Sequence, residues 1–412
     1  MILDEYRGVV AVVGLLGLAW MCSENRRQVS LTPLAYGIIG QASIALILLK
    51  FEPARHIFLI LGQGVDALST ATRSGTSFVF GYVGGGPAPF DVVHPENGFG
   101  LAFQALPVVI LITALSAVLY HWRILPLVVR MLARPLQRWF GLGGAVGMSA
   151  AAMPFLGMVE SPLLIRPYLS FLSRGELFIL MTGGMSTIAG SVMILYATFL
   201  KGIIQDPIGH LLTSALMGIP LAIAVAKTIC PETGHTDANA VTPARYGGAI
   251  DAIMQGTMDG VRIVVGIVAV LLVTVALVHL INGVLDYFPG DLSLQRMVGW
   301  VMAPVAWAMG IAPGDILKAG ALLGEKTVLN ELIAFSDLAH MPSEALTDHS
   351  RIILVYALCS FSNFGSLGIL VGGLSVIAPE RRAEIIQLGP KAMLAGSITS
   401  CINGAVAGLI LG

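Results

Sequence analysis

Two short stretches decide how this chain folds: GMVESP at Gly157–Pro162 and NELIA at Asn330–Ala334. Each places one carboxylate, Glu160 or Glu331, in a segment that is otherwise too apolar to hold a charge. A charged side chain at the centre of a membrane helix costs about 2.5–3.5 kcal/mol or more, so residues of this kind are functional by default. The two stretches therefore predict a site that is built from two similar halves of the chain.

A segment rich in glycine and hydroxylated residues follows each carboxylate. These segments are MTGGMSTIAGSV at Met181–Val192 and CSFSNFGSLG at Cys359–Gly368. Glycine-interrupted hydrophobic helices at corresponding positions of two halves are the pattern that best marks the binding site of a secondary transporter. We therefore expect two broken membrane helices beside the two carboxylates.

The composition excludes an ordinary soluble enzyme. Of the 412 residues, 56% are hydrophobic and only 11% are charged, whereas soluble domains carry about 25% charged residues. The net charge of −1 lacks the basic excess that nucleic-acid binding requires. We expect a multi-pass protein of the lipid bilayer with no nucleic-acid partner and no cofactor.

Apolar runs near the length needed to cross a bilayer recur along the chain. We predict an all-α polytopic membrane protein with about eight transmembrane helices and two re-entrant helical hairpins in an inverted repeat. The predicted spans are Tyr6–Met21, Leu31–Leu49, Leu101–Tyr120, Glu176–Leu200, Ile208–Thr228, Gly256–Leu285, Arg351–Ile377 and Ala392–Leu411. The predicted hairpins are Gly143–Leu172 and Gly314–Leu338.

Other segments are too polar or too broken to span. Pro53–Arg73 has the pattern of an amphipathic helix, and we expect Ser74–Phe90 to be a loop packed against protein. The polar segment Cys230–Gly247 is predicted to be an inner loop. Three arginines at four-residue spacing predict a helix on the inner membrane surface: Arg130, Arg134 and Arg138.

This order of elements predicts four regions. Residues 1–142 hold the N-terminal spans, interfacial helices and scaffold elements, and residues 256–312 hold a long scaffold helix and a connecting segment. Residues 143–255 form the first repeat and residues 313–412 the second, each with one hairpin and one broken helix. Together the two repeats would form a transport domain.

Three other interpretations of the two carboxylates stay open at this point. Each could serve the fold alone, by capping hairpin amides or by pairing with Arg166 or Lys326. A passive facilitator or channel for another small polar solute would need a similar polar centre. A membrane-embedded enzyme is disfavoured, because the sequence has no HExxH helix and no nucleophile elbow.

The chain resembles the concentrative nucleoside transporter family over nearly its whole length. The similarity rests on six stretches: GTSFVFG from Gly75, ESPLLIRPYL from Glu160, STIAGSV from Ser186, CPET at Cys230–Thr233, LNELIAF from Leu329 and YALCSFSNFGSLGI from Tyr356. The resemblance implies a homotrimeric inner-membrane symporter that imports nucleosides or close ribosyl relatives. It also implies an elevator mechanism, in which both hairpins move across the membrane.

The resemblance implies roles for individual residues. Glu331, Asn363 and Ser366 would bind the ribose hydroxyls, and Phe361 would line the pocket. On the base side, Glu160 and Val192 match the family pattern. The polar pair that commonly precedes this glutamate is absent, because Met158 and Val159 stand there. This difference removes two hydrogen-bonding side chains from the base side.

The coupling ion is the second point at which this sequence departs from the family. The family's sodium site matches Met153, Leu156, Thr187 and Ile188. Met153 stands where an asparagine would supply an oxygen ligand, and a thioether suits sodium poorly. The coupling ion would then be either sodium at a degenerate site or a proton. The hypothesis that we favour is a proton carried by one of the two glutamates.

Overall fold

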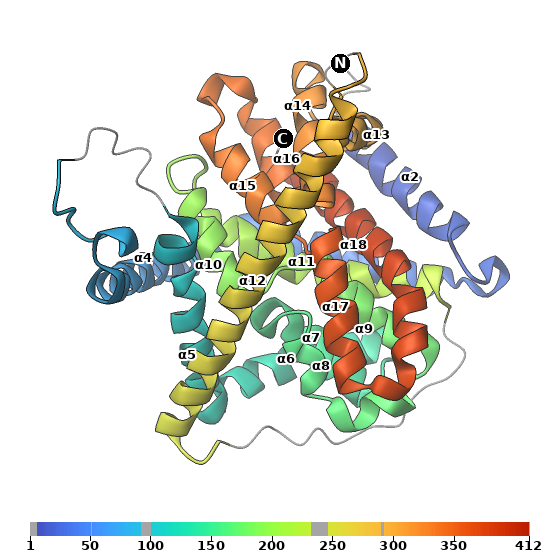
Figure 1. Cartoon of the computed structure of the whole chain (residues 1–412). Helices are drawn as coiled ribbons and strands as arrows, with labels where there is room; N and C mark the ends of the chain where they lie inside the picture. The colour runs from blue at the N-terminus through green and yellow to red at the C-terminus, as the bar shows by residue number, and fades with distance from the viewer. Residues whose placement is uncertain (1–5, 51, 92–99, 232–245, 290–291, 412) are drawn as a thin grey trace.

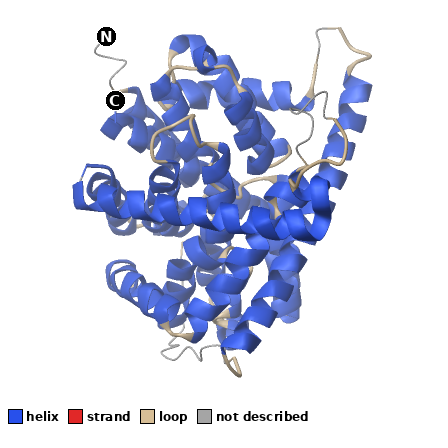
Figure 2. Ribbon diagram, turned by 90° about the vertical axis from the view of Figure 1, so that its left-hand side faces the viewer, coloured by secondary structure: helices blue, strands red, loops and turns tan. Residues whose placement is uncertain are grey.

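The described part of the chain is helical throughout. The computed structural model describes residues 6–50, 52–91, 100–231, 246–289 and 292–411, and within these ranges no β-strand occurs (Figure 2). Most of the predicted inner loop, residues 232–245, lies outside them. Five helical segments are long and apolar enough to cross a membrane: Leu31–Lys50, Leu101–His121, Pro207–Ile229, Ala249–Ala269 and Pro379–Leu411.

The remaining predicted spans are one short helix and two broken helices. The short helix is α2 (Arg7–Met21). The first broken span consists of α9 (Arg174–Ser186) and α10 (Gly190–Phe199). The second consists of α16 (Asp348–Leu358) and α17 (Phe364–Ile377). Both interruptions fall within the two glycine-rich and hydroxyl-rich segments, as the sequence predicts.

One sequence expectation is wrong in part. We expected a loop from Ser74, but α4 (Glu52–Phe80) continues through it and a 3-10 turn (Gly81–Gly84) follows. The Ser74 hydroxyl donates to the carbonyl oxygen four residues earlier, so this polar side chain is satisfied within the helix. The Thr76 hydroxyl donates to the Gly84 carbonyl at 2.8 Å and folds the turn back on the helix.

The same order of elements occurs twice along the chain. Each copy has a leading helix, a second helix, a hairpin, a broken helix and a closing long helix. The first copy contains α5 (Pro107–His121), α6 (Ile124–Phe140), the hairpin of α7 (Gly144–Leu156) and α8 (Glu160–Leu163), then α9, α10 and α11 (Pro207–Ile229). The second contains α12 (Ala249–Leu285), α13 (Leu294–Ala308), the hairpin of α14 (Ile316–Val328) and α15 (Glu331–His340), then α16, α17 and α18 (Arg382–Leu411).

The two leading helices of the copies cross each other. In Figure 1, α12 runs diagonally across the molecule and meets α5. Glycines permit the close approach: a Cβ on Gly260 would lie 2.2 Å from Thr113 Oγ1, and one on Gly256 would lie 2.7 Å from the Thr113 carbonyl oxygen. Much of α12 beyond this crossing is exposed and apolar, as expected for a helix that faces lipid or another subunit.

The two helix breaks lie inside a helical shell, whereas much of α17 beyond the second break is at least partly exposed. The closing helices α11 and α18 are mostly buried, with 83% and 72% of their most apolar windows covered by protein. Both pack against α9, and α16 packs against α18. Backbone groups freed at a helix break are tolerated at membrane depth only where protein or a water-filled cavity surrounds them. The surrounding helices therefore shield the two breaks from lipid, so that their backbone groups can find partners within the protein.

A group of charged side chains joins three elements at one end of the shell. Glu24, after α2, accepts hydrogen bonds from Arg174 at 2.8 and 3.0 Å and from Lys391 of α18 at 2.8 Å. Arg174 starts α9 and also reaches Glu384 at 3.4 Å. The hydrogen bonds from Arg174, helped by Lys391, lower the pKa of Glu24 to about 2. One carboxylate therefore ties α2, α9 and α18 together.

We expect acid to weaken this link. A carboxyl group whose pKa falls from 4.5 to about 2 on folding stabilises the fold fully above pH 4.5, and that contribution is lost as the pH falls toward 2. Glu24→Gln cannot ionise, so its midpoint of thermal unfolding in detergent should fall less with acidification than that of the unmodified protein. Glu344→Gln, at an exposed residue, is the control. If the unfolding midpoints of the Glu24 variant and the unmodified protein fell equally with acidification, Glu24 would not be the group that makes this link sensitive to pH.

Candidate functional site

Glu331 is held by partners from both broken helices. Its side chain is 5% exposed, and it begins α15 directly after the hairpin turn. Glu331 Oε1 accepts a hydrogen bond from the Tyr196 hydroxyl at 2.8 Å, and Oε2 accepts one from Asn363 Nδ2 at 2.7 Å. The second hairpin is therefore joined to α10 and to the start of α17 through one buried carboxylate.

Asn363 is oriented by its place at a helix start. It is the N-cap of α17, and its Oδ1 accepts a hydrogen bond from the Ser366 backbone N–H at 2.7 Å. Because the carbonyl end of the amide is engaged in the cap, the amino end faces Glu331. Ser366 and Phe361 are both buried beside it, at 7% and 8% exposure. The structure thus places Glu331, Asn363 and Ser366, predicted for the ribose, close together, with Phe361, predicted for the pocket wall, in the same break.

Tyr196 is a site residue that the sequence analysis missed. Its ring stacks on Phe335 of α15, with centroids 4.8 Å apart and planes 27° apart, while its hydroxyl bonds Glu331. Tyr196 lies four residues after Val192 and therefore on the same helical face. This spacing from a predicted site residue was the signal that could have found it.

The tip of the first hairpin is shaped around Glu160. Gly157 has a φ of 102°, a left-handed conformation that favours glycine. A Cβ there would lie 2.9 Å from Glu160 Oε2 and 3.1 Å from the Ala189 Cβ. The Glu160 carboxylate therefore lies against the backbone of its own hairpin tip. That it serves the fold as a cap stays a prediction of the sequence.

The pairing that the sequence left open for the carboxylates does not occur among the described residues. Arg166 is exposed and forms no ion pair with Glu160 or Glu331. Lys326 is buried, but its ammonium bonds three neutral oxygens instead of a carboxylate. Neither glutamate is therefore neutralised by a direct salt bridge.

Met158 and Val159 pack against glycines of the two broken helices. A Cβ on Gly184 of α9 would lie 2.8 Å from the Met158 Cβ. A Cβ on Gly373 of α17 would lie 2.8 Å from Val159 Cγ1. Both side chains hold the tip of the first hairpin between α9 and α17, so their apolar character has a packing function.

Helix α10 connects the two halves of the site. Ala189 precedes it and touches the first hairpin at Gly157, while Tyr196 bonds Glu331 of the second. These two residues are seven positions apart, which corresponds to about 10 Å along a helix. Val192, 6% exposed, lies between them. The two carboxylate-bearing hairpins therefore approach the same short helix from its two ends.

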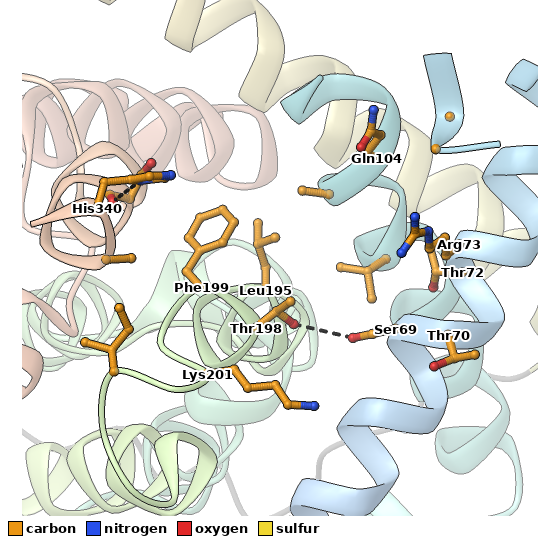
Figure 3. Close-up of a pocket in the computed structure, with 17 residues that line it drawn as sticks. Ser69, Thr70, Thr72, Arg73, Gln104, Leu195, Thr198, Phe199, Lys201 and His340 are labelled. Atoms are coloured by element: carbon orange, nitrogen blue, oxygen red, sulfur yellow. Dashed lines mark hydrogen bonds between the residues drawn. The ribbon is translucent and has the colours of Figure 1, made fainter. Parts of the chain in front are cut away.

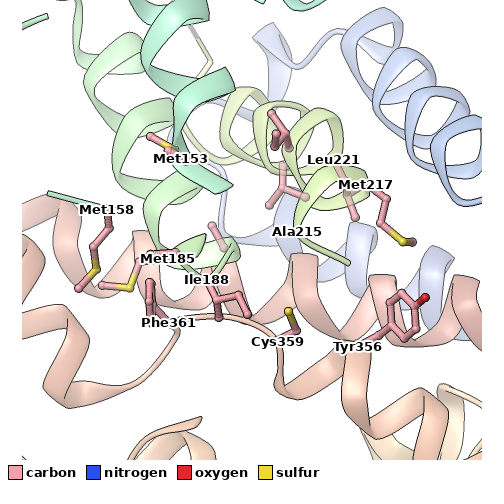
Figure 4. Packing of buried hydrophobic residues seen from close by; sticks show 14 of the residues in the cluster. Met153, Met158, Met185, Ile188, Ala215, Met217, Leu221, Tyr356, Cys359 and Phe361 are labelled. Carbon is pink, nitrogen blue, oxygen red and sulfur yellow. The ribbon is translucent and has the colours of Figure 1, made fainter. Parts of the chain in front are cut away.

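The second helix break supplies hydrogen bonds to the first. The Phe361 backbone N–H donates to the Thr187 carbonyl oxygen at 3.3 Å. The Ser362 hydroxyl donates to the Met185 carbonyl oxygen at 2.8 Å. Figure 4 shows Met185, Ile188 and Phe361 close together at this crossing. The carbonyls freed at the first break are thus partly occupied by donors of the second.

The four residues predicted for a sodium site lie around the first break. Met153 is 1% exposed, and its sulfur lies against Gly183, where a Cβ would be only 2.5 Å away. The Thr187 hydroxyl donates to the Gly183 carbonyl at 3.2 Å. Ile188 is buried and Leu156 is half-buried. Of these four side chains, only that of Thr187 carries an oxygen, and Met153 places a thioether sulfur beside the break.

A cavity of about 980 Å³ opens beside this centre. Figure 3 shows Arg73 and Gln104 on one side of it, with Thr198 and Lys201 facing them. Its lining also includes Leu195 and Phe199 of α10 and Ser336 and His340 of α15. Because Leu195 and Ser336 adjoin Tyr196 and Phe335 in sequence, the stacked aromatic pair lies next to the cavity wall. None of the predicted site residues lines this cavity.

Family models match most of the chain. A model described as "Na+ dependent nucleoside transporter N-terminus" matches residues 10–83, and the corresponding C-terminus model matches residues 210–408. Residues 102–202 match a model described as "Nucleoside recognition". These matches include both broken helices and the second hairpin.

Full-length relatives agree with these models. The "uncharacterized transporter YutK" of Bacillus subtilis is 34% identical over 98% of this chain and 99% of its own. The "nucleoside permease NupC" of Helicobacter pylori is 30% identical and is matched over 99% of its length by the whole of this chain. The human "sodium/nucleoside cotransporter 1" is 30% identical over 99% of this chain and 64% of its own.

Solved structures share the fold. CNTnw in an inward-facing substrate-bound state is 32% identical, with a TM-score of 0.88 over 100% of this chain and 99% of its own. A CNTnw variant in an outward-facing state gives a TM-score of 0.90 at 30% identity with the same coverage. This similarity confirms the predicted fold of an elevator-type helical transporter and excludes the enzyme interpretation. The chain is a member of the family of Na+ dependent, concentrative nucleoside transporters.

Proposed function

We propose that this chain imports nucleosides across the inner membrane in symport with protons, as a homotrimer whose two hairpins move together. The observation that carries the substrate assignment is the buried carboxylate of Glu331, bonded by Tyr196 and Asn363. An ionised carboxylate offers about four lone pairs, and two of them are used here. The other two can accept hydrogen bonds from vicinal ribose hydroxyls.

The neighbouring groups suit a sugar as well. Asn363 and Ser366 belong to the first turn of α17, beside Glu331. Phe361 supplies an apolar wall. Small-molecule sites combine apolar walls with a few fixed polar groups that set orientation. We assign Glu331, Asn363 and Ser366 to the ribose and Phe361 to the pocket wall.

The base would lie toward the first hairpin. Glu160 and Val192 remain the base-side residues that we propose, because α10 places Val192 between the first hairpin tip and Glu331. Met158 and Val159 bring no hydrogen-bonding side chain to this tip. We therefore expect base recognition to rest mainly on the carboxylate of Glu160 and on apolar contact, with weak discrimination among bases.

The elevator assignment is supported by the relatives. CNTnw has been solved in inward-facing, outward-facing and intermediate states. We propose that the repeats at residues 143–255 and 313–412 move, while residues 1–142 and 256–312 provide the scaffold and the contacts between subunits. The exposed apolar surface of α12 is suited to such contacts.

Substitution at Glu331 tests the sugar assignment. We expect Glu331→Gln to lower the efficiency of radiolabelled uridine uptake into proteoliposomes by about 10- to 100-fold, because hydrogen bonds to a charged group contribute about 1.5–3 kcal/mol. Tyr196→Phe removes only one donor to the same carboxylate and should have a smaller effect.

Two measurements make this test specific. Size-exclusion chromatography should show the same assembly for both variants as for the unmodified protein. Glu344→Gln, a change at an exposed glutamate of the same repeat, should leave uptake unchanged. Unchanged uptake in Glu331→Gln would remove this residue from the proposed site.

The coupling ion is tested by varying the sodium and proton gradients separately. We expect an inward proton gradient to drive uridine accumulation without sodium, because Met153 offers sulfur where sodium needs oxygen. Met153→Asn should introduce a sodium stimulation of uptake at constant pH. Met153→Leu keeps an apolar side chain and should not.

A dependence of uptake on sodium would contradict the proposed proton coupling. Full dependence of uptake on sodium at constant pH in the unmodified protein would show that the remaining oxygens around Thr187 and Ile188 suffice for sodium. Proton coupling would then be excluded, while the assignment of the sugar site would stand.

A further inference from the structure

Lys326 is a buried cation with no carboxylate partner among the described residues. It lies near the end of α14, and its side chain is 3% exposed. The ammonium donates to the Ala357 carbonyl oxygen at 2.7 Å, to Ser360 Oγ at 2.6 Å and to Ser400 Oγ at 3.0 Å. All three N–H groups of the ammonium are therefore satisfied, each by a neutral oxygen.

The position of these oxygens explains how a charge is tolerated there. Ala357 is the next-to-last residue of α16, which ends at Leu358, and Ser360 lies in the break that follows. The last four carbonyls of a helix have no partner within it, and the helix dipole places partial negative charge at that end. The ammonium of Lys326 therefore caps a half-helix that ends inside the protein.

The first repeat lacks such a cation at the corresponding place. At the end of α9, the Gly183 carbonyl accepts hydrogen bonds from the hydroxyls of Ser186 and Thr187. The Met185 carbonyl accepts one from Ser362. These donors are neutral and lie within the two breaks themselves. The two half-helix ends thus differ by one covalently attached positive charge.

We propose that Lys326 is a positioning residue of the substrate site, a built-in cation that holds the second hairpin on its broken helix. Lys326 and Glu331 lie on the two sides of the hairpin turn, and they bond residues on the two sides of the helix break. The two tethers together fix the orientation of Glu331 toward Asn363. This inference rests on the sugar site proposed above.

The proposal has a consequence for ion use. Because the ammonium is part of the chain, the sugar half of the site is assembled without any bound ion. Removing the side chain would leave the Ala357, Ser360 and Ser400 oxygens around a space that a small monovalent cation can enter. In a protein without this lysine, added monovalent cations should then change the KM for uridine uptake, whereas they should not change it in the unmodified protein.

The test compares Lys326→Gln and Lys326→Ala with Lys318→Gln. Lys318 lies on the same helix, is exposed and bonds a backbone carbonyl, so it is a matched control. We expect both Lys326 variants to raise the KM for uridine uptake about tenfold or more, since hydrogen bonds from a charged donor are lost. Added methylammonium should restore the KM of Lys326→Ala but not that of Lys326→Gln, whose side chain still fills the space.

Hydrogen exchange measured without substrate separates this inference from the sugar assignment. The backbone N–H of Ile333, capped by Asn330 at 3.0 Å, and its neighbours in the second hairpin should exchange faster in both Lys326 variants than in Lys318→Gln. Unchanged exchange together with an unchanged KM in Lys326→Gln would overturn the proposal. If the unmodified protein took up no uridine, the proposed sugar site would be contradicted. The hydrogen-exchange result would still decide the role of Lys326, because it is measured without substrate.

If both Lys326 variants fail to assemble, a milder variant can test the same role. Ser400→Ala removes one acceptor of the ammonium from α18 and deletes a single oxygen. It should raise the KM a few-fold and accelerate exchange at the same hairpin amides. Thr399→Ala, at a neighbouring residue whose hydroxyl bonds its own helix, should do neither. Equal behaviour of the two variants would refute the positioning role.

Discussion

Backbone groups freed where a helix breaks inside an apolar shell must find partners within the protein, and this constraint organises the whole molecule. The breaks after Ser186 and Leu358 each leave carbonyls without helical partners. Phe361 and Ser362 of the second break donate to carbonyls of the first, while Lys326 donates to the Ala357 carbonyl at the second. The first break therefore depends on the second for two hydrogen bonds, and the crossing of the two breaks defines the centre of the fold.

The groups that satisfy the breaks also include residues of the proposed site. Asn363 caps α17 with one end of its amide and presents the other end to Glu331. Glu160 Oε2 lies against Gly157 of its own hairpin tip. A polar group buried at this depth must be satisfied whether substrate is present or not. The same hydrogen bonds that allow the fold therefore preorganise the donors and acceptors that a nucleoside would meet.

Charge is distributed differently at the end of the shell and at its centre. At the end, Glu24 bonds Arg174 and Lys391 directly in ion pairs that join helices. At the centre, Glu331 and Lys326 are both bonded by neutral groups. A carboxylate that is not locked in a salt bridge keeps lone pairs for a substrate hydroxyl, which suits a transport site.

The sequence by itself determined the class of the protein and the positions of the spans and both hairpins, because hydrophobic length and buried polar groups leave strong local signals. The sugar-side roles of Glu331, Asn363 and Ser366 stay predictions that the family resemblance implies. The sequence did not find the hydrogen bond of Tyr196 to Glu331 or the neutral partners of Lys326, and it placed a loop where α4 continues beyond Ser74. Only the tertiary structure decided these points. Tyr196 and Glu331 are 135 residues apart, and a hydrogen bond between distant residues has no periodicity in sequence. The same holds for Lys326, whose neutral partners come from two other helices.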